Sequence, residues 1–123
     1  MVEFALILPI FLLLVFAIVD FGMGFHAWLT VTNSAREGAR LGSVGGTQPE
    51  IVQRVRDTAA TIDQSQLTVV VTNAQGTPGD AVTVDVDYQY EIITPLAGMI
   101  QFVSGNNIGT TLNFSSTAEM RLE

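Results

Sequence analysis

Residues 4–19 read FALILPIFLLLVFAIV, sixteen positions without a charge between Glu3 and Asp20. No polar side interrupts this run, so a helix formed from it is apolar all round. Such a helix must be surrounded by lipid or by other apolar helices. The rest of the 123-residue chain is too small and too polar to supply that surround. We therefore predict that the helix is buried by something outside its own chain.

The helical pattern continues to about Gly42, where glycines and a serine end it. A helix over residues 1–42 would span roughly 63 Å, whereas a bilayer core takes about 30 Å. We therefore expect residues 25–42 to leave the membrane as an amphipathic segment that packs on the sheet of a small domain formed by residues 43–123. Helical spacing predicts that its packing side carries Phe25, Trp28, Leu29, Thr32, Ala35 and Ala39.

The apolar run contains a proline, and it also has to be distinguished from a secretory signal. Pro9 lacks the amide that would bond to the carbonyl of Ala5, so a kink or a short opened turn is expected there. A cleavable secretory signal is disfavoured, because the run follows an acid rather than a basic region and no small-residue cleavage site succeeds it.

Glu3 and Asp20 are acids that a purely apolar anchor would lack. Either their carboxylates reach water at the membrane edges, or one enters an apolar interior paired with a cation, because unpaired intramembrane acids are expensive. For Asp20 the first reading is favoured, since two glycines and His26 follow it. For Glu3 both readings stay open.

The remaining chain predicts an α+β domain with a short helix and a small antiparallel sheet of about three strands. Thr47 and Glu50 form a capping box that begins a helix over about residues 49–62. Strands are predicted at residues 67–72, 81–92 and 110–121 from β-branched content and alternation. Residues 94–103 read as a helical turn or a loop, and residues 104–109 as a turn.

Composition argues against most chemistries. Twelve acids face five arginines and no lysine, for a net charge of −7, so a nucleic-acid surface is not expected. The absence of cysteine excludes disulfides and thiolate metal sites. We expect no cofactor, no metal and no enzymatic activity, because no nucleophile–base pair or ligand set is visible.

Three weaker signals concern a calcium site, a histidine ligand and a glycosylation site. The acids Asp85, Asp87 and Glu91 share a strand face, yet lack the loop of a calcium site, so a solvated acidic face is preferred. His26 has no visible partner carboxylate, so a ligand role is disfavoured. Asn113 begins a glycosylation sequon, Asn-Phe-Ser, which is a pattern with a high false-positive rate.

Two blocks of sequence resemble one family. They are VEFALILPIFLLLVFAIVDFG (2–22) with NSAREGARLG (33–42), and TVDVDYQYEIITPLAGMI (83–100) with the closing TAEMRLE. Together they look like the TadE-like proteins, pilin-like subunits of the tight-adherence branch of type IV pili. The resemblance runs nearly end to end except for the loops of the middle third, and its N-terminal block is the more specific.

The resemblance implies a precursor held in the cytoplasmic membrane, trimming by a prepilin peptidase, and packing of the long helices into an extracellular filament core by the pilus assembly machinery. By resemblance, Glu3 is the acid that pairs with the terminal amine of an adjacent subunit. That acid is usually the fifth mature residue and here it is the third, so either processing differs or Met1 is not the native mature end. Contacts between subunits are expected at Glu3, Phe4, Pro9, Phe11, Phe16, Asp20 and Phe21.

Two functions remain. The first is a pilin that polymerises with copies of itself into a filament for adhesion or surface motility. The second is a single-pass membrane protein, or a minor pseudopilin of a secretion or pilus assembly, whose outer domain binds a ligand or partner. The acidic strand face and the apolar 94–103 segment support the second function.

Overall fold

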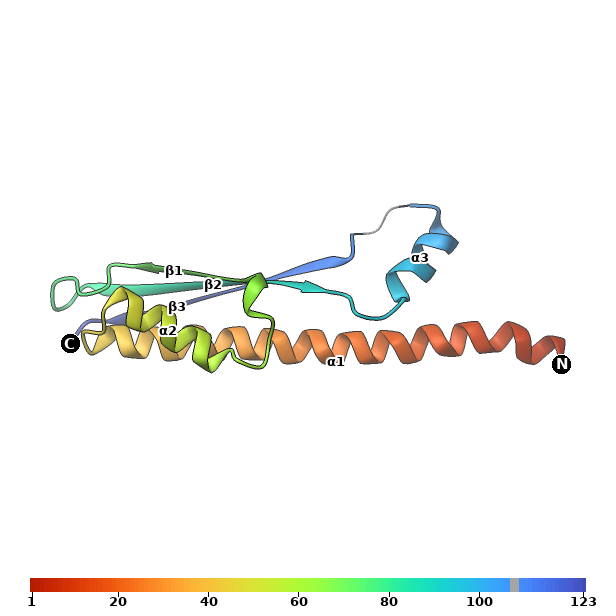
Figure 1. The fold of residues 1–123 in the computed structure, drawn as a ribbon, viewed down its shortest axis with the longest axis horizontal. Helices are drawn as coiled ribbons and strands as arrows, with labels where there is room; N and C mark the ends of the chain where they lie inside the picture. Colours follow the sequence, from red (N-terminus) through yellow and green to blue (C-terminus); the bar gives the residue numbers. More distant parts are fainter. Residues whose placement is uncertain (107–108) are drawn as a thin grey trace. The chain divides into compact units, whose positions relative to one another are not determined.

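A computed structural model of the chain describes residues 1–106 and 109–123. Its elements are three helices, one 3₁₀ turn and three strands (Figure 1). In chain order they are α1 (Val2–Ser43), α2 (Gln48–Thr58), η1 (Gln64–Gln66), β1 (Leu67–Thr72), β2 (Ala81–Glu91), α3 (Leu96–Ser104) and β3 (Thr111–Arg121). The predicted α+β class is confirmed, with a long apolar first helix, a short second helix and a three-stranded sheet.

Helix α1 is continuous over 42 residues and contains Pro9. The opened turn expected at Pro9 is therefore wrong. A proline removes a single backbone hydrogen bond. The apolar residues on both sides of Pro9 are helical, and the backbone hydrogen bonds of those turns keep the helix continuous. The helix ends one residue beyond the predicted stop, at Ser43, where the Ser43 hydroxyl donates to the Arg40 carbonyl at 2.8 Å.

Helix α2 begins at the predicted capping box. Both the backbone N–H and the hydroxyl of Thr47 donate to Glu50 Oε2, each at 2.8 Å. The helix ends at Thr58 rather than near Ile62. The side-chain amide of Gln64 explains the earlier end, because its Nε2 donates to the carbonyls of Arg56 at 3.3 Å and Ala59 at 2.7 Å and so satisfies the helix C-terminus.

The sheet has the order β1–β2–β3, with β2 central. Strand β1 pairs antiparallel with β2 in a register that places Leu67 opposite Tyr88 and Thr72 opposite Thr83. The predicted alternation in β2 is confirmed: Val82, Val84, Val86, Tyr88 and Tyr90 are buried, and the residues between them are exposed or half-buried. Strand β3 begins at Thr111, one residue after the predicted start.

The segment at residues 94–103 was expected to be a helical turn or a loop; the helical alternative is confirmed, and it forms a nine-residue helix, α3. It starts after Pro95 and ends at Gly105, which has a positive φ of 69° as the left-handed C-cap. Of the turn predicted at residues 104–109, positions 107 and 108 lie outside the described residues.

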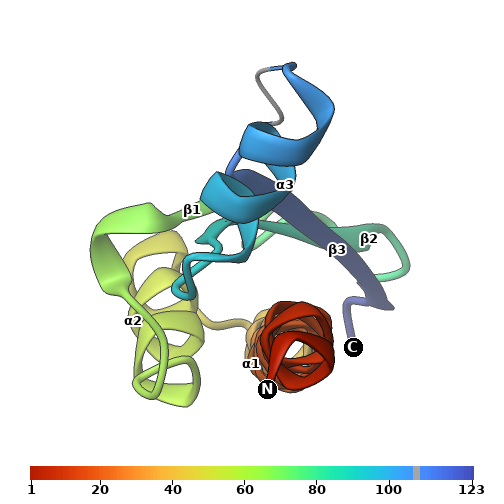
Figure 2. The same cartoon turned by 90° about the vertical axis from the view of Figure 1, so that its right-hand side faces the viewer.

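The chain divides into two compact units. The first combines Met1–His26 with Tyr90–Leu112, and the second combines Ala27–Gln89 with Asn113–Glu123. Each unit therefore joins a stretch of α1 to segments that are distant in the sequence. In the second unit, α1 and α2 lie on one face of the sheet (Figure 2).

The core of the second unit forms where α1 meets α2 and β2. A Cβ built on Gly38 would lie 2.5 Å from Val55 Cγ2, and one on Gly42 would lie 2.9 Å from Val82 Cγ2. Only small residues fit such an approach. The side of α1 that is buried here therefore carries Ala27, Val31, Ser34, Ala35, Gly38, Ala39 and Gly42.

This packing corrects the side of residues 25–42 that was expected to face the sheet. Ala35 and Ala39 are buried as predicted. The bulky residues Phe25, Trp28 and Leu29 are each more than 40% exposed rather than buried, and Thr32 is half-buried. The physical reason is the short distance between the helices and the sheet, which leaves no room for large side chains.

Candidate assembly surface

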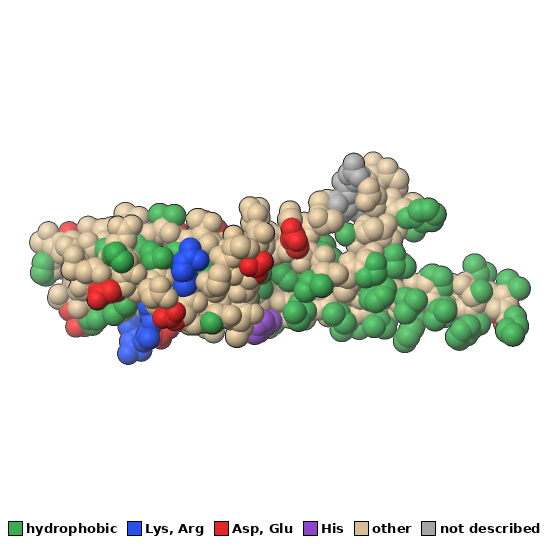
Figure 3. All heavy atoms as spheres, in the orientation of Figure 1, with side chains coloured by type: hydrophobic (Ala, Val, Ile, Leu, Met, Phe, Trp, Pro, Cys, Tyr) green, Lys and Arg blue, Asp and Glu red, His purple; other side chains and the backbone are tan. Residues whose placement is uncertain are grey.

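The N-terminal half of α1 presents an apolar surface that its own chain leaves uncovered. Within α1, none of the most apolar 18-residue window is buried. The exposed large side chains include Phe4, Leu6, Ile7, Leu8, Ile10, Phe11, Leu12, Leu14, Ile18 and Val19. Figure 3 shows hydrophobic side chains along this part of the helix, while arginines and acids gather elsewhere. We call residues 4–19 the apolar segment.

Among the described residues, α1 is the one helix long and apolar enough to cross a membrane. Its composition and exposure agree with the prediction that something outside the chain buries it. A soluble core helix of the same composition would be covered by its own domain.

The predicted assembly residues differ in their surroundings. Phe4, Pro9, Phe11 and Phe21 are exposed, and Phe16 is half-buried. The ring of Phe21 stacks on that of Phe25, with centroids 6.4 Å apart and an interplanar angle of 11°. The aromatic residues therefore lie at several positions along the helix.

Glu3 lies in the first turn of α1 and is exposed. Acids are favoured near a helix N-terminus, because the unsatisfied N–H groups there carry partial positive charge. Among the described residues no basic side chain pairs with it, since the ion pairs present join Glu37 to Arg40 and Arg54. Its carboxylate is thus placed at the very start of the apolar segment, available to a group from outside the chain.

Asp20 differs from the favoured expectation. It is only 8% exposed, so its carboxylate does not reach water in this structure. Oδ1 accepts a hydrogen bond from the Thr94 N–H at 3.4 Å, and Oδ2 accepts one from the Thr94 hydroxyl. The Tyr90 hydroxyl donates to the Asp20 backbone carbonyl at 3.5 Å. The expectation failed because hydroxyl and amide donors from the same chain replace water.

These partners were missed from the sequence. Tyr90 and Thr94 lie 70 and 74 positions after Asp20, and no local pattern links them. The one available signal was Asp20 itself, since a buried carboxylate requires donors. Nothing in the sequence said which donors would supply them.

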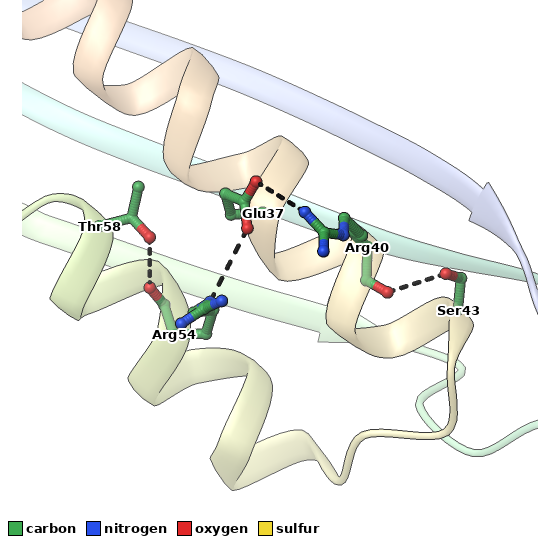
Figure 4. Close-up of polar contacts among 5 residues, drawn as sticks. All are labelled: Glu37, Arg40, Ser43, Arg54 and Thr58. Carbon is green, nitrogen blue, oxygen red and sulfur yellow. Dashed lines mark hydrogen bonds and ion pairs between the residues drawn. The ribbon is translucent and has the colours of Figure 1, made fainter.

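A second polar cluster joins α1 to α2 in the second unit (Figure 4). Glu37 is 3.6 Å from Arg40 on its own helix and 3.8 Å from Arg54 on α2. The guanidinium side chains are more than half exposed, so each pair contributes little to stability. The cluster holds no nucleophile and reads as a link between the two helices.

The acidic side of β2 remains a surface. Asp85 accepts a hydrogen bond from the Thr117 hydroxyl at 2.5 Å, and Asp87 and Glu91 are exposed. No group of three or more potential metal ligands occurs within residues 1–106 and 109–123. His26 is exposed on α1, and Asn113 is exposed on β3.

Comparison with known families identifies the helix. The sequence profile described as "TadE-like protein" matches residues 1–40, about a third of the chain. Over these residues the chain is similar to TadE-like proteins. The resemblance noted from the sequence is thereby confirmed over α1, including the apolar segment, Glu3 and Asp20. No curated protein and no solved structure is significantly similar to the chain.

Residues 1–40 are therefore similar to TadE-like proteins, and they lie in a helix that is long and apolar enough to cross a membrane. The match ends at residue 40, before α2 begins. Residues 41–123 therefore contribute their own geometry, and not a family assignment, to the function.

Proposed function

We propose that this protein is a pilin-like structural subunit that polymerises through α1 into an extracellular Tad-type filament, and that it has no enzymatic role. Before assembly the apolar segment spans the cytoplasmic membrane. A prepilin peptidase trims the precursor, and the assembly machinery then transfers it to the filament. There the apolar segment lies among the same segments of sister subunits, and the filament serves adhesion or surface motility.

The observation that carries this proposal is that no residue of the apolar segment is buried within its own chain. A bilayer core is about 30 Å thick, whereas the whole of α1, with 42 residues, is roughly twice as long. The same helix continues into a stretch that packs on α2 and β2 through small residues. A subunit with an uncovered apolar helix at its N-terminus and a folded domain after it suits a filament with a helical core.

Glu3 gives the assembly its specificity in this proposal. Its carboxylate lies at the start of the apolar segment and has no cationic partner among the described side chains. In the filament it would pair with the terminal amine of an adjacent subunit. Inside a filament core the Glu3 carboxylate requires a cationic partner, because leaving a charge unpaired in an apolar environment costs several kcal/mol.

A second candidate is a single-pass membrane protein or minor pseudopilin whose outer domain binds a partner. The observation in its favour is the exposed side of β2, where Asp87 and Glu91 face solvent. On this alternative the chain stays in the cell envelope or occupies a few positions of an assembly, and the apolar segment remains in lipid.

Immunogold electron microscopy separates the two candidates. Cells are sheared, and the released filaments are labelled with an antibody to the exposed acids and loops of the second unit. The proposal predicts label along the filaments. Label confined to the cell envelope favours the membrane-bound alternative, and label at filament tips favours a minor subunit. Intact mass of the isolated chain then gives the mature N-terminus and any glycan at Asn113.

A further inference from the structure

Residues 92–112 contain no charged side chain, although the chain as a whole carries a net charge of −7. This stretch includes α3 and belongs to the first compact unit. Several of its large apolar side chains are exposed: Ile93, Ile100, Phe102, Val103 and Leu112. Phe102 is 92% exposed, which is unusual for a phenylalanine in a folded domain.

The same stretch is attached to α1 at one defined level. Thr94 donates to the Asp20 carboxylate through its N–H and its hydroxyl, and α3 begins two residues later at Leu96. Asp20 is the residue that directly follows the uncharged run of α1. The attachment therefore joins the start of α3 to the end of the apolar segment.

We propose that α3 is a membrane-docking helix, which lies in the headgroup boundary of the bilayer that holds α1 and inserts Phe102 and Val103 among the lipid chains. This inference rests on the insertion of α1 in a membrane and not on its polymerisation. Lipid is the occupant because α3 is attached through Thr94 to Asp20, where the apolar segment of α1 ends, and this inference places that segment in a bilayer. Helices that lie in the plane of the interface bind by burying an apolar face at the boundary of headgroups and acyl chains.

The charge distribution supports lipid over a second protein. Protein interfaces place a polar and charged rim around an apolar centre, and no charged side chain occurs anywhere in residues 92–112. The stretch itself carries no acid that anionic lipid headgroups would repel. The acids that adjoin it are Glu91 in the sequence and Asp20, whose carboxylate accepts hydrogen bonds from Thr94. Within α3 only Ala97 is buried, so the helix has little cover from its own chain.

The natural absence of cysteine permits a direct test. The full chain is reconstituted in vesicles of phosphatidylcholine and phosphatidylglycerol, with one cysteine labelled by an environment-sensitive fluorophore. Phe102→Cys is the test position, and Ile10→Cys reports insertion of α1. Val70→Cys is the matched control, because Val70 is also an exposed apolar residue (49%) but lies on β1.

Docking predicts that the Phe102→Cys label is blue-shifted and quenched by headgroup-level nitroxide lipids at least about twofold more than the Val70→Cys label. Thr94→Val should reduce this quenching, while the Ile10→Cys label stays quenched by lipids that carry the nitroxide deep on the acyl chain. If the Phe102→Cys label matches the Val70→Cys label while Ile10→Cys is quenched, docking is wrong and insertion stands. If no label is quenched, insertion fails too. Disulfide-linked dimers of Phe102→Cys without lipid quenching would identify a second copy as the occupant and overturn the inference.

Discussion

The Asp20 carboxylate accepts hydrogen bonds from the Thr94 N–H at 3.4 Å and from the Thr94 hydroxyl, across 74 positions of sequence. This contact satisfies a buried acid on a helix that lipid or sister helices must surround. If the chain polymerises as proposed, the Asp20 carboxylate already has donors from Thr94 within its own chain. Glu3 is then the acid of the apolar segment that is left for contacts between subunits.

Loss of the Thr94 hydroxyl should loosen the attachment of residues 92–104. Thr94→Val keeps the shape of the side chain but leaves the Asp20 carboxylate with one donor fewer, which costs about 1–3 kcal/mol. Hydrogen exchange in the full chain should show faster exchange of the α3 amides. Thr68→Val, an exposed strand position, is the control and should leave α3 unchanged. Equal exchange in both variants would show that the contact does not hold α3.

Gly38→Ala should destabilise the second unit. The new Cβ would lie 2.5 Å from Val55 Cγ2, and such overpacking costs about 1–3 kcal/mol. Gly22→Ala is the matched control on the same helix, because nothing lies within 4 Å of its Cβ position. Thermal unfolding of the detergent-solubilised chain, followed by near-ultraviolet circular dichroism, measures the difference.

The steric origin of that effect has its own check. Val55→Ala in the Gly38→Ala background should recover part of the lost stability, although Val55→Ala alone is destabilising because it removes buried methyl groups. Strictly additive losses in the double variant would show that the two side chains do not collide.

Stability of the α2 N-terminus should fall in acid. Two hydrogen bonds to the Glu50 carboxylate hold its pKa below the ordinary value of 4.5. The Thr47 backbone N–H has the larger effect and the Thr47 hydroxyl the smaller one. A carboxyl with a lowered folded pKa stabilises the folded state above the unfolded pKa, and this contribution is lost as pH falls through the folded pKa. Nuclear magnetic resonance titration should give Glu50 a pKa that rises in Thr47→Ala, since the hydroxyl donor is removed. An unchanged pKa would exclude the hydroxyl as a donor.

Removal of the Glu3 carboxylate should block assembly and spare insertion. Glu3→Ala leaves the terminal amine of a neighbouring subunit unpaired in the filament core, at a cost of about 3–5 kcal/mol. Filament yield from sheared cells should drop strongly while the amount of chain in the membrane stays constant. Glu91→Ala, which removes an exposed acid from β2, should assemble normally. Full assembly of Glu3→Ala would contradict the pairing.

Local patterns predicted what local physics decides. The alternation of β2 placed Val84 and Tyr88 inside, and the Thr47–Glu50 capping box placed the start of α2. The packing side of α1 was misjudged, because the distance between helix and sheet selects Gly38 over Trp28, and that distance is not written in helical spacing. The partner of Asp20 could not be predicted either, because Thr94 lies 74 positions later and its place depends on the path of the chain after β2.

Accessibility of the apolar segment in filaments free of lipid tests the central claim most directly. A Phe11→Cys chain is expressed, filaments are sheared from cells without detergent, and a water-soluble maleimide is applied. If α1 forms the filament core, the chain is present in the filaments and Phe11→Cys reacts only after detergent dissociates them, whereas Val70→Cys reacts throughout. A chain that stays with the membrane fraction, or a Phe11→Cys that reacts in intact filaments, would contradict it.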